Sequence, residues 1–308
     1  MKYIESSLGK LKLDSCVTVA SGTFGLDYLK LRDADGKLLL PQESLGAYVS
    51  KTITYELKAG NPSPRLYETE CGLLNSIGLQ NPGLKGFLQT DLPILKDALR
   101  IPLIVSFSGS SIDEFCEMIT AMEPYQEIAG YEVNVSCPNV EKEGIAFGAD
   151  PDVIHKLVAS LAALTDKELI VKLSPSVTDI AQMALAAQEA GASSIALINT
   201  LWGMAIDWRT GKAMLSKKVG GYSGRGVKPV ALALVYKVAQ VVDIPILAMG
   251  GIHTWQDALE FIYAGASAVA VGTANFNDPG APAKIAKGLQ EHCKTNNIHI
   301  KDLIANLR

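Results

Sequence analysis

The sequence predicts an α/β fold in which eight parallel strands alternate with helices to form a single (βα)8 TIM barrel. Three observations support this fold. Eight short runs rich in β-branched residues each end in small or polar residues, and helical patterns lie between most of these runs. The runs are almost continuously apolar, which is typical of parallel strands covered by helices. Eight strands favour a closed barrel over an open sheet, because each strand then has two neighbours.

The expected elements follow the chain in order. Residues 6–15 are expected to form a small hairpin at the start. The expected strands are residues 17–22, 47–54, 102–109, 131–137, 168–174, 194–200, 244–251 and 268–274. The expected helices are residues 151–165, 179–192, 227–242 and 254–266. Thr254 fits the N-cap of the last of these helices, and Gly265 fits its C-terminal end.

Two long connections, residues 55–101 and 201–226, separate expected strands. Long insertions after the strands of a barrel lie over the ligand-binding face, so we expect both connections there. No shift in composition and no linker marks a boundary. Residues 1–308 are therefore expected to form one domain.

Composition argues against several classes of protein. The formal net charge of −4 gives no reason to expect binding to nucleic acid or to an anionic membrane. The five cysteines are far apart and form no CxxC motif, which argues against a disulfide framework and against a metal or iron–sulfur site in this chain. No uncharged apolar run reaches the ~18 residues of a membrane span, and the N-terminus lacks the apolar core of a signal peptide. A cytoplasmic location is expected.

Candidate functional residues lie at the C-terminal ends of the expected strands, where barrels of this kind carry their working side chains. These ends contain Ser21, Lys51, Ser106, Asn134, Cys137, Lys172, Asn199, Thr200, Gly250, Gly251, Gly272 and Thr273. The set includes no His, Asp or Glu. It therefore argues against most hydrolytic and metal-dependent sites, which need paired carboxylates or imidazole ligands.

Two glycine-containing segments after the seventh and eighth strands predict a phosphate site. They read MGGI (249–252) and VGTA (271–274). Glycine lets the backbone approach an anion, and amide groups at the start of a helix donate to it. The alternative is that both segments are only tight turns. The run GGYSGRG (220–226) is a weaker signal of the same kind, or a flexible turn.

Lys51 and Lys172 lie inside expected strands near their C-terminal ends. A buried lysine is costly unless it meets an anion or strong acceptors. Two lysines facing one cavity suit an electron-rich ring that gains negative charge on reduction, such as a flavin. The alternative for each lysine is an internal ion pair, or a stem that lies along apolar surface while its amine reaches water.

Side-chain amides supply the remaining polar groups of the predicted pocket. Asn75, Asn134, Asn139 and Asn199 each offer donors and an acceptor without charge, which suits a ring with alternating N–H and C=O groups. Any one of them is also compatible with a turn, and this is the preferred interpretation for Asn139, which follows Pro138.

Cys137 is the candidate acid or base. A free thiol has a pKa of ~8.5, closer to neutrality than that of lysine, and needs little adjustment to accept a proton. The alternative of an inert buried thiol suits Cys16, Cys71, Cys116 and Cys293 better than a cysteine at a strand end before a proline.

The chain resembles the dihydroorotate dehydrogenases, and specifically their class 1 enzymes, along nearly its whole length. The motifs that carry the resemblance are ASGTFG (20–25), SKT (50–52), GNPSPR (60–65), NSIGLQNPG (75–83), NVSCPN (134–139), VKLSP (171–175), INTLWGMAIDWRTGK (198–212), GGYSGRGVKP (220–229), MGGI (249–252) and VGTANF (271–276). NVSCPN and NSIGLQN together are highly specific. The class 2 enzymes have serine in place of Cys137 and an N-terminal extension.

The resemblance implies an FMN-binding barrel that oxidises (S)-dihydroorotate to orotate in pyrimidine (UMP) biosynthesis. The implied FMN contacts are Ala20, Ser21, Lys51, Thr52, Ser106, Asn134, Lys172, Ile198, Gly224, Gly250, Gly251, Gly272 and Thr273. The implied pyrimidine contacts are Lys51, Asn75, Ser76, Ile77, Gly78, Leu79, Asn134, Asn139, Asn199 and Thr200. Cys137 would remove the C5 proton while the C6 hydride passes to FMN N5. Lys51 and Lys172 would stabilise negative charge near the flavin.

Within class 1, residues 198–212 and 220–229 most resemble the NAD-linked class 1B catalytic subunit. The resemblance then implies a homodimer, with a partner subunit that carries FAD and a [2Fe–2S] cluster and can complete a heterotetramer. Two departures bear on this subtype. Ser106 stands where class 1B usually has asparagine and the fumarate-linked class 1A has serine, and Arg225 is unusual in its loop.

Three other readings compete with a class 1B enzyme. The first is the fumarate-linked class 1A enzyme. The second is a dihydropyrimidine dehydrogenase, which is disfavoured because its motif usually continues from the cysteine into Pro-His-Gly, whereas this chain has Pro138 and Asn139. The third is a non-redox barrel, such as a sugar-phosphate isomerase or aldolase, which explains the phosphate segments but not the amide-rich pocket.

Overall fold

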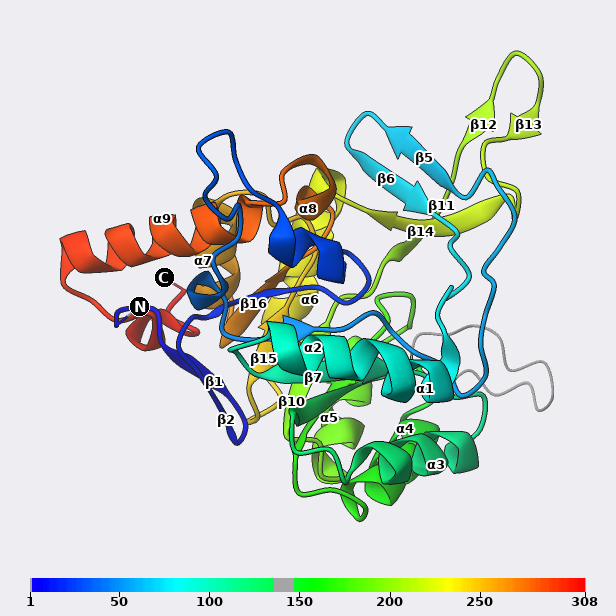
Figure 1. Ribbon diagram of the computed structural model, residues 1–308, viewed down its shortest axis with the longest axis horizontal. Helices are drawn as coiled ribbons and strands as arrows, with labels where there is room; N and C mark the ends of the chain where they lie inside the picture. Colours follow the sequence, from blue (N-terminus) through cyan, green and yellow to red (C-terminus); the bar gives the residue numbers. More distant parts are fainter. Residues whose placement is uncertain (1, 136–146, 308) are drawn as a thin grey trace.

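The computed structural model describes residues 2–135 and 147–307 of the chain. Within these residues, eight parallel strands form one sheet in the order β3-β16-β15-β10-β9-β8-β7-β4 (Figure 1). The strands are β3 (Val17–Val19), β4 (Tyr48–Val49), β7 (Leu103–Phe107), β8 (Ile128–Asn134), β9 (Glu168–Lys172), β10 (Ser194–Leu197), β15 (Ile246–Ala248) and β16 (Ala268–Val271). The sheet closes between β3 and β4, where Thr18 and Ala47 form a parallel bridge. The predicted barrel is confirmed.

Each predicted strand is present but ends earlier than expected. At the end of β4, Ser50 N still donates to Ile104 O over 2.9 Å, and the chain pairs again when Ile53 N donates to Ser106 O over 3.0 Å. Lys51 and Thr52 lie between these two points. The side chains of greatest interest for a ligand therefore lie at or just beyond the ends of the regular strands.

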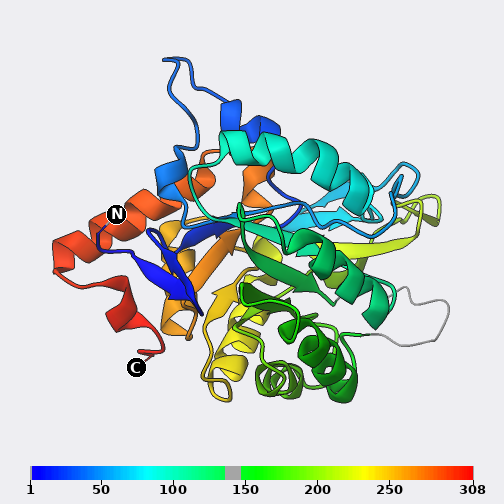
Figure 2. The same cartoon turned by 60° about the horizontal axis from the view of Figure 1, so that its bottom comes forward.

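Helices surround the barrel (Figure 2). The longer ones are α2 (Leu92–Ala98), α3 (Ile112–Met122), α4 (Pro151–Ala162), α5 (Ile180–Glu189), α6 (Lys228–Ala239), α7 (Trp255–Tyr263) and α9 (Ala281–Asn296). The short ones are α1 (Gly83–Gly86), α8 (Ala274–Asn277), a π-helical segment (Phe87–Asp91) and 3₁₀ segments at Leu26–Lys30, Gln42–Ser44, Arg225–Val227 and Ile300–Leu303. No helix in this described part of the chain is both long and apolar enough to cross a membrane.

The four predicted helices are confirmed as α4, α5, α6 and α7. The predicted cap of α7 is also present. Thr254 Oγ1 accepts a hydrogen bond from Asp257 N over 3.2 Å, and Asp257 Oδ2 accepts one from Thr254 N over 2.9 Å. This reciprocal arrangement satisfies amide groups that a helix start otherwise leaves unpaired. Gly265 follows the helix with φ of 118°, a conformation that glycine adopts without strain.

The predicted N-terminal hairpin, β1 (Ser6–Leu8) and β2 (Leu11–Leu13), closes one end of the barrel. Leu8 and Leu13 are buried in an apolar cluster with Ile104, Ile170 and Leu247 from the barrel strands. At the same end, the buried side chain of Glu168 accepts hydrogen bonds from Lys10 N over 2.9 Å and from Ser194 Oγ over 2.5 Å. A second and larger cluster packs the outer face of the strands against the helices.

The two long connections build a second sheet at the opposite end of the barrel from the hairpin (Figure 1 and Figure 2). It has the order β11-β14-β6-β5 and consists of β5 (Leu66–Thr69), β6 (Gly72–Asn75), β11 (Leu201–Met204) and β14 (Val219–Ser223). A small ribbon of β12 (Ile206–Asp207) and β13 (Lys212–Ala213) extends from it. The connections thus lie where they were expected. The interpretation of residues 220–226 as a flexible turn is wrong for Gly220–Ser223, because this segment is part of β14.

Candidate active site

Three side chains from neighbouring strands meet inside the barrel. Ser106 of β7 donates its hydroxyl to Glu132 Oε1 of β8 over 2.7 Å. Lys172 Nζ of β9 lies 3.4 Å from the same oxygen, and the Lys172 and Glu132 side chains are only 5% and 1% exposed. Lys172 Nζ also donates to Ser21 Oγ over 2.9 Å. The alternative interpretation of Lys172 as a member of an internal ion pair is therefore confirmed, and this ion pair lies among the predicted site residues.

Lys51 approaches the same group of charges. Burial lowers the pKa of Lys51 below its usual value of 10.5, and the positive charge of Lys172 lowers it further, whereas Glu132 opposes the shift. A Cβ added to Gly22 would lie 3.2 Å from Lys51 Nζ. The short loop after β3 therefore packs against this amine, and the two predicted lysines lie within electrostatic reach of each other.

Polar side chains from other strand ends are linked to this group of charges by hydrogen bonds. Asn134 Nδ2 donates to Thr52 Oγ1 over 3.4 Å, and Thr52 Oγ1 lies 2.9 Å from Ser106 Oγ. Asn199 Nδ2 donates to Asn134 Oδ1 over 3.3 Å. Asn199 Oδ1 in turn accepts a hydrogen bond from Thr200 N over 2.8 Å. The predicted amide residues Asn134 and Asn199 thus form one connected set with the hydroxyl groups.

The second sheet brings Asn75 to Thr200. Asn75 Nδ2 donates to Gly221 O over 3.2 Å. Gly221 packs so tightly against the Thr200 side chain that an added Cβ would collide with it. Glycine is required at this position of β14 because a larger residue would push the two connections apart.

The loop after Asn75 has an unusual backbone that the chain holds in place. Gly78 has φ of 74° and Leu79 has φ of 51°, which is uncommon for a residue with a side chain. Asn81 Nδ2 donates to Leu79 O over 2.6 Å and to Thr54 Oγ1 over 2.8 Å, which ties the loop to the segment after β4. The preceding residues of the loop bond to Asn61. Asn61 Nδ2 donates to Ser76 O over 3.0 Å, and Asn61 N donates to Ile77 O over 2.9 Å.

The predicted phosphate segments follow β15 and β16. Gly250 and Gly251 have φ of 130° and 81°, and an added Cβ on either would lie 2.7 Å from a Cβ atom of helix α6. Backbone conformation and close packing therefore explain these two glycines without a ligand. Ile198 lies beside them, because the same added Cβ on Gly250 would lie 3.3 Å from Ile198 Cγ1.

Gly272 differs from these glycines. It is not among the glycines with positive φ, and an added Cβ would lie 3.6 Å from Ala20 Cβ, an ordinary contact distance. The protein itself does not require glycine at this position, so the bare backbone favours the close approach of a ligand. Next to it, Thr273 Oγ1 donates to Ser223 Oγ over 2.8 Å and brings Gly224 of the glycine run to the same end of the barrel.

Two predicted site residues, Cys137 and Asn139, lie outside the described residues. The other four cysteines carry free thiols, of which Cys16 and Cys293 are buried, Cys116 is partly buried and Cys71 is exposed, so the interpretation as a buried thiol is wrong for Cys71. Cys16 is fully buried, and desolvation raises its pKa to about 12. Such a thiol stays protonated near neutrality, which agrees with the interpretation of Cys16 as an inert core residue.

Glu132 is a site residue that the sequence analysis missed. The predicted site residues lie at strand ends, whereas Glu132 lies two positions before the end of β8. Side chains alternate across a strand, so Glu132 points to the same face as Asn134. A carboxylate two residues before a predicted site amide, inside an otherwise apolar run, is the signal that could have identified it.

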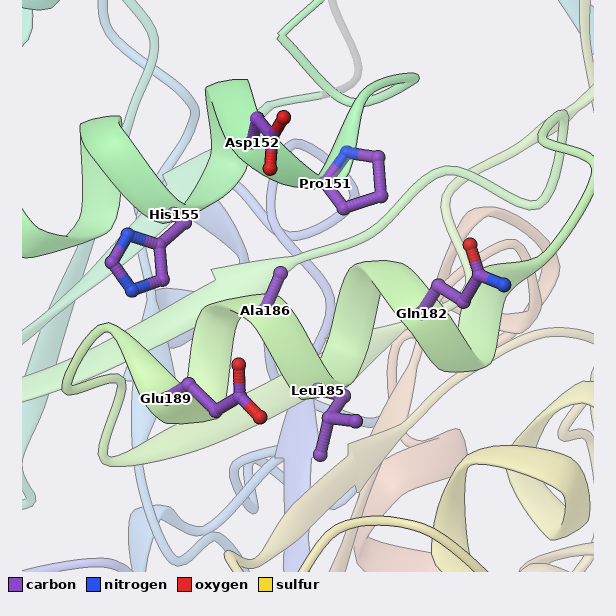
Figure 3. A pocket seen from close by; sticks show the side chains of 7 residues that line it. All are labelled: Pro151, Asp152, His155, Gln182, Leu185, Ala186 and Glu189. Atoms are coloured by element: carbon purple, nitrogen blue, oxygen red, sulfur yellow. The ribbon is translucent and has the colours of Figure 1, made fainter.

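A shallow pocket of about 250 Å³ lies elsewhere, between α4 and α5 (Figure 3). It is lined by Pro151, Asp152, His155, Gln182, Leu185, Ala186 and Glu189. Both helices belong to the outer layer, and no predicted site residue lines this pocket. The strand ends remain the candidate active site.

Known proteins match this chain over almost its whole length. A family model described as Dihydroorotate dehydrogenase matches residues 3–293. The chain is 46% identical over 303 residues to the "Dihydroorotate dehydrogenase B (NAD(+)), catalytic subunit" of Geotalea uraniireducens. The matched region covers 96% of this chain and 95% of that protein. It is 43% identical over 306 residues to the protein of the same name from Thermoanaerobacter pseudethanolicus, with 99% of each chain covered.

Proposed function

Because the chain belongs to the dihydroorotate dehydrogenase family, we propose that it is the catalytic subunit of an NAD-linked, class 1B enzyme that oxidises (S)-dihydroorotate to orotate in pyrimidine biosynthesis. One structural observation carries the proposal. Two lysines, a carboxylate and a connected set of amides and hydroxyls gather at the strand ends, where a barrel places its reaction.

FMN is the proposed cofactor. The bare backbone of Gly272 supports a ligand at the predicted phosphate position, and the buried ammonium groups of Lys51 and Lys172 suit a ring that gains negative charge. When bound, FMN supplies the acceptor for the hydride that leaves C6 of the substrate. The residues proposed to hold it are Ala20, Ser21, Lys51, Thr52, Ser106, Asn134, Lys172, Ile198, Gly224, Gly250, Gly251, Gly272 and Thr273.

The pyrimidine is proposed to lie against the amides. Asn134 and Asn199 lie side by side and are joined by one hydrogen bond, and an amide group offers two donors and an acceptor, which suits a ring with N–H and C=O groups. Lys51 is proposed to bind the substrate's carboxylate or ring oxygens. Asn75, Thr200 and the loop of Ser76, Ile77, Gly78 and Leu79 are proposed to hold the other edge, together with Asn139.

Cys137 is proposed as the base that removes the C5 proton. This proton is weakly acidic because C5 is next to a carbonyl group, and a thiol needs only a modest shift in pKa to accept it near neutrality. The role rests on the sequence motif NVSCPN. Lys172 is proposed to assist by stabilising negative charge that develops beside it.

The proposed electron route leads to NAD⁺ through a partner subunit with FAD and a [2Fe–2S] cluster. The word "subunit" in the names of the relatives supports such a partner. Ser106, which class 1A shares, is fully buried and bonded on both sides inside the barrel. It therefore acts within the pocket rather than at a surface that an acceptor reaches. A homodimeric core and a cytoplasmic location are proposed from the family resemblance.

The test is anaerobic reduction of the purified flavoprotein with dihydroorotate, followed by mixing with an oxidant. We expect slow reoxidation by fumarate, and rapid reoxidation by NAD⁺ only when a co-purified iron–sulfur protein is present. Rapid reoxidation by fumarate alone would instead establish the class 1A alternative. Failure of dihydroorotate to reduce the flavin would refute both subtypes.

A further inference from the structure

A chain of hydrogen bonds with a fixed direction runs through the candidate site. Glu132 is a carboxylate, which only accepts hydrogen bonds, so Ser106 must donate its single hydroxyl proton to it. Ser106 Oγ can then only accept from Thr52, 2.9 Å away. Thr52 Oγ1 in turn accepts from Asn134 Nδ2. The carboxylate therefore determines the direction of every bond as far as Asn134.

This direction orients an amide of the proposed substrate pocket. With its nitrogen committed to Thr52, Asn134 presents its oxygen toward Asn199, which donates to it over 3.3 Å. A neutral group that both donates and accepts hydrogen bonds, in place of Glu132, would leave the Ser106 hydroxyl free to rotate. The order of donors and acceptors at the substrate would then be less well defined.

The carboxylate also determines the net charge of the pocket. By formal charge, the two lysines Lys51 and Lys172 and the glutamate Glu132 give 2 − 1 = +1. Glu132 Oε2 is buried and has no hydrogen-bond partner within residues 2–135 and 147–307. Burying a carboxylate with one oxygen unsatisfied is unfavourable for stability, so stability alone does not explain its presence.

We propose that Glu132 is a positioning residue of this site, which orients Lys172 and the Asn134 amide and offsets one of the two lysine charges beside the flavin. The inference rests on the proposed function. Glu132 acts through its neighbours Ser106 and Lys172, and Cys137 remains the proposed base.

The first experiment measures the midpoint potential of FMN bound to the purified holoprotein by equilibration with a reference dye. Glu132→Gln keeps an acceptor oxygen for Ser106 but changes the pocket charge from +1 to +2. The reduced, more negative flavin is then bound more tightly relative to the oxidised form. A tenfold change in that ratio shifts the two-electron potential by about +30 mV.

The matched control is Glu168→Gln, which neutralises the other buried barrel glutamate at the hairpin end. We expect its flavin potential to equal that of the wild type. An unchanged potential in Glu132→Gln, or an equal shift in both variants, would overturn the inference. A wild-type protein that binds no FMN would refute the proposed function itself.

A second pair of variants applies if Glu132→Gln does not fold. Lys172→Gln brings the pocket charge to 1 − 1 = 0 and is expected to lower the potential. The double variant Lys172→Gln with Glu132→Gln restores +1 and replaces the buried ion pair by neutral groups, which proteins usually tolerate better than one unpaired charge. Recovery of the potential in the double variant supports the proposal, and no recovery contradicts it.

The orienting role has its own readout. Ser106→Ala breaks the hydrogen-bond chain without changing any charge. We expect orotate affinity, measured from the perturbation of the flavin absorption spectrum, to fall by about two- to tenfold, the effect of one hydrogen bond. Unchanged orotate affinity would refute this part of the proposal.

Discussion

The side-chain amide of Asn199 donates to Asn134 Oδ1 over 3.3 Å and joins the C-terminal ends of β10 and β8. The strand between them, β9, ends at Lys172. A polar surface at the barrel mouth therefore spans three adjacent strands.

Asn199→Ala is expected to weaken orotate binding by roughly tenfold, because one amide that is proposed to face the pyrimidine is lost and Asn134 Oδ1 loses the hydrogen bond that Asn199 donates. Perturbation of the flavin spectrum by orotate provides the measurement. Asn296→Ala is a suitable control, since this amide donates to His292 O on the outer helix α9. Equal orotate affinity in the wild type and Asn199→Ala would place the substrate elsewhere.

Cys137→Ser is expected to slow reduction of the flavin by dihydroorotate by ~10²–10⁴-fold at neutral pH, the usual contribution of a positioned base. The defect should be smaller at high pH, and FMN and orotate binding should be largely retained. Stopped-flow measurement under anaerobic conditions gives the rate. Cys116→Ser on α3 is the control and should reduce at the wild-type rate. A wild-type rate for Cys137→Ser would exclude Cys137 as the base.

Orotate affinity is expected to decline on the alkaline side at a pH below the ordinary lysine value of 10.5. The reason is that burial favours the neutral form of Lys51, so its pKa is lowered and its positive charge is lost earlier as the pH rises. Binding titrations across this pH range test the expectation. In Lys51→Met the affinity should be lower throughout and should lack this decline. An identical pH profile in the variant would assign the ionisation to another group.

Glu168 is expected to make the barrel less stable as the pH rises. Burial raises its pKa above the usual 4.5, so in the window above 4.5 the folded chain binds a proton that the unfolded chain has released. The contribution of Glu168 to stability is thus complete below this window and is lost as the pH rises through the folded-state pKa. Thermal unfolding midpoints at several pH values provide the test. The unfolding midpoint of the wild type should fall relative to that of Glu168→Gln as the pH rises. A constant difference between the two midpoints would contradict the raised pKa.

The barrel was predictable from the sequence because its strands are apolar runs with clear ends, such as Glu168–Lys172 and Ala268–Val271. The second sheet was not. Its strand β14 contains Gly220 and Gly221, which resemble a turn in sequence, yet each is glycine because the backbone of Asn75 or the side chain of Thr200 lies too close for a Cβ. Close approach between distant segments leaves no local periodic pattern.

The candidate site was predictable in part. Lys51, Lys172, Asn134 and Asn199 do come together, because strand ends of a barrel meet at one mouth. The phosphate interpretation of Gly250 and Gly251 is weaker than expected, since their backbone conformation already demands glycine. Glu132 escaped notice because its importance depends on neighbours from two other strands, Ser106 and Lys172. The sequence signals Glu132 only by a carboxylate two residues before Asn134 in an apolar run, and the register of the sheet then shows which neighbours it meets.

The most direct test of the account is a crystal structure of the protein with FMN and orotate. We predict FMN with its phosphate near the backbone of Gly272 and its ring beside Lys172, and orotate against Asn134 and Asn199 with C5 facing Cys137. Orotate bound away from these amides, or a barrel mouth that holds no flavin in a protein saturated with FMN, would contradict it.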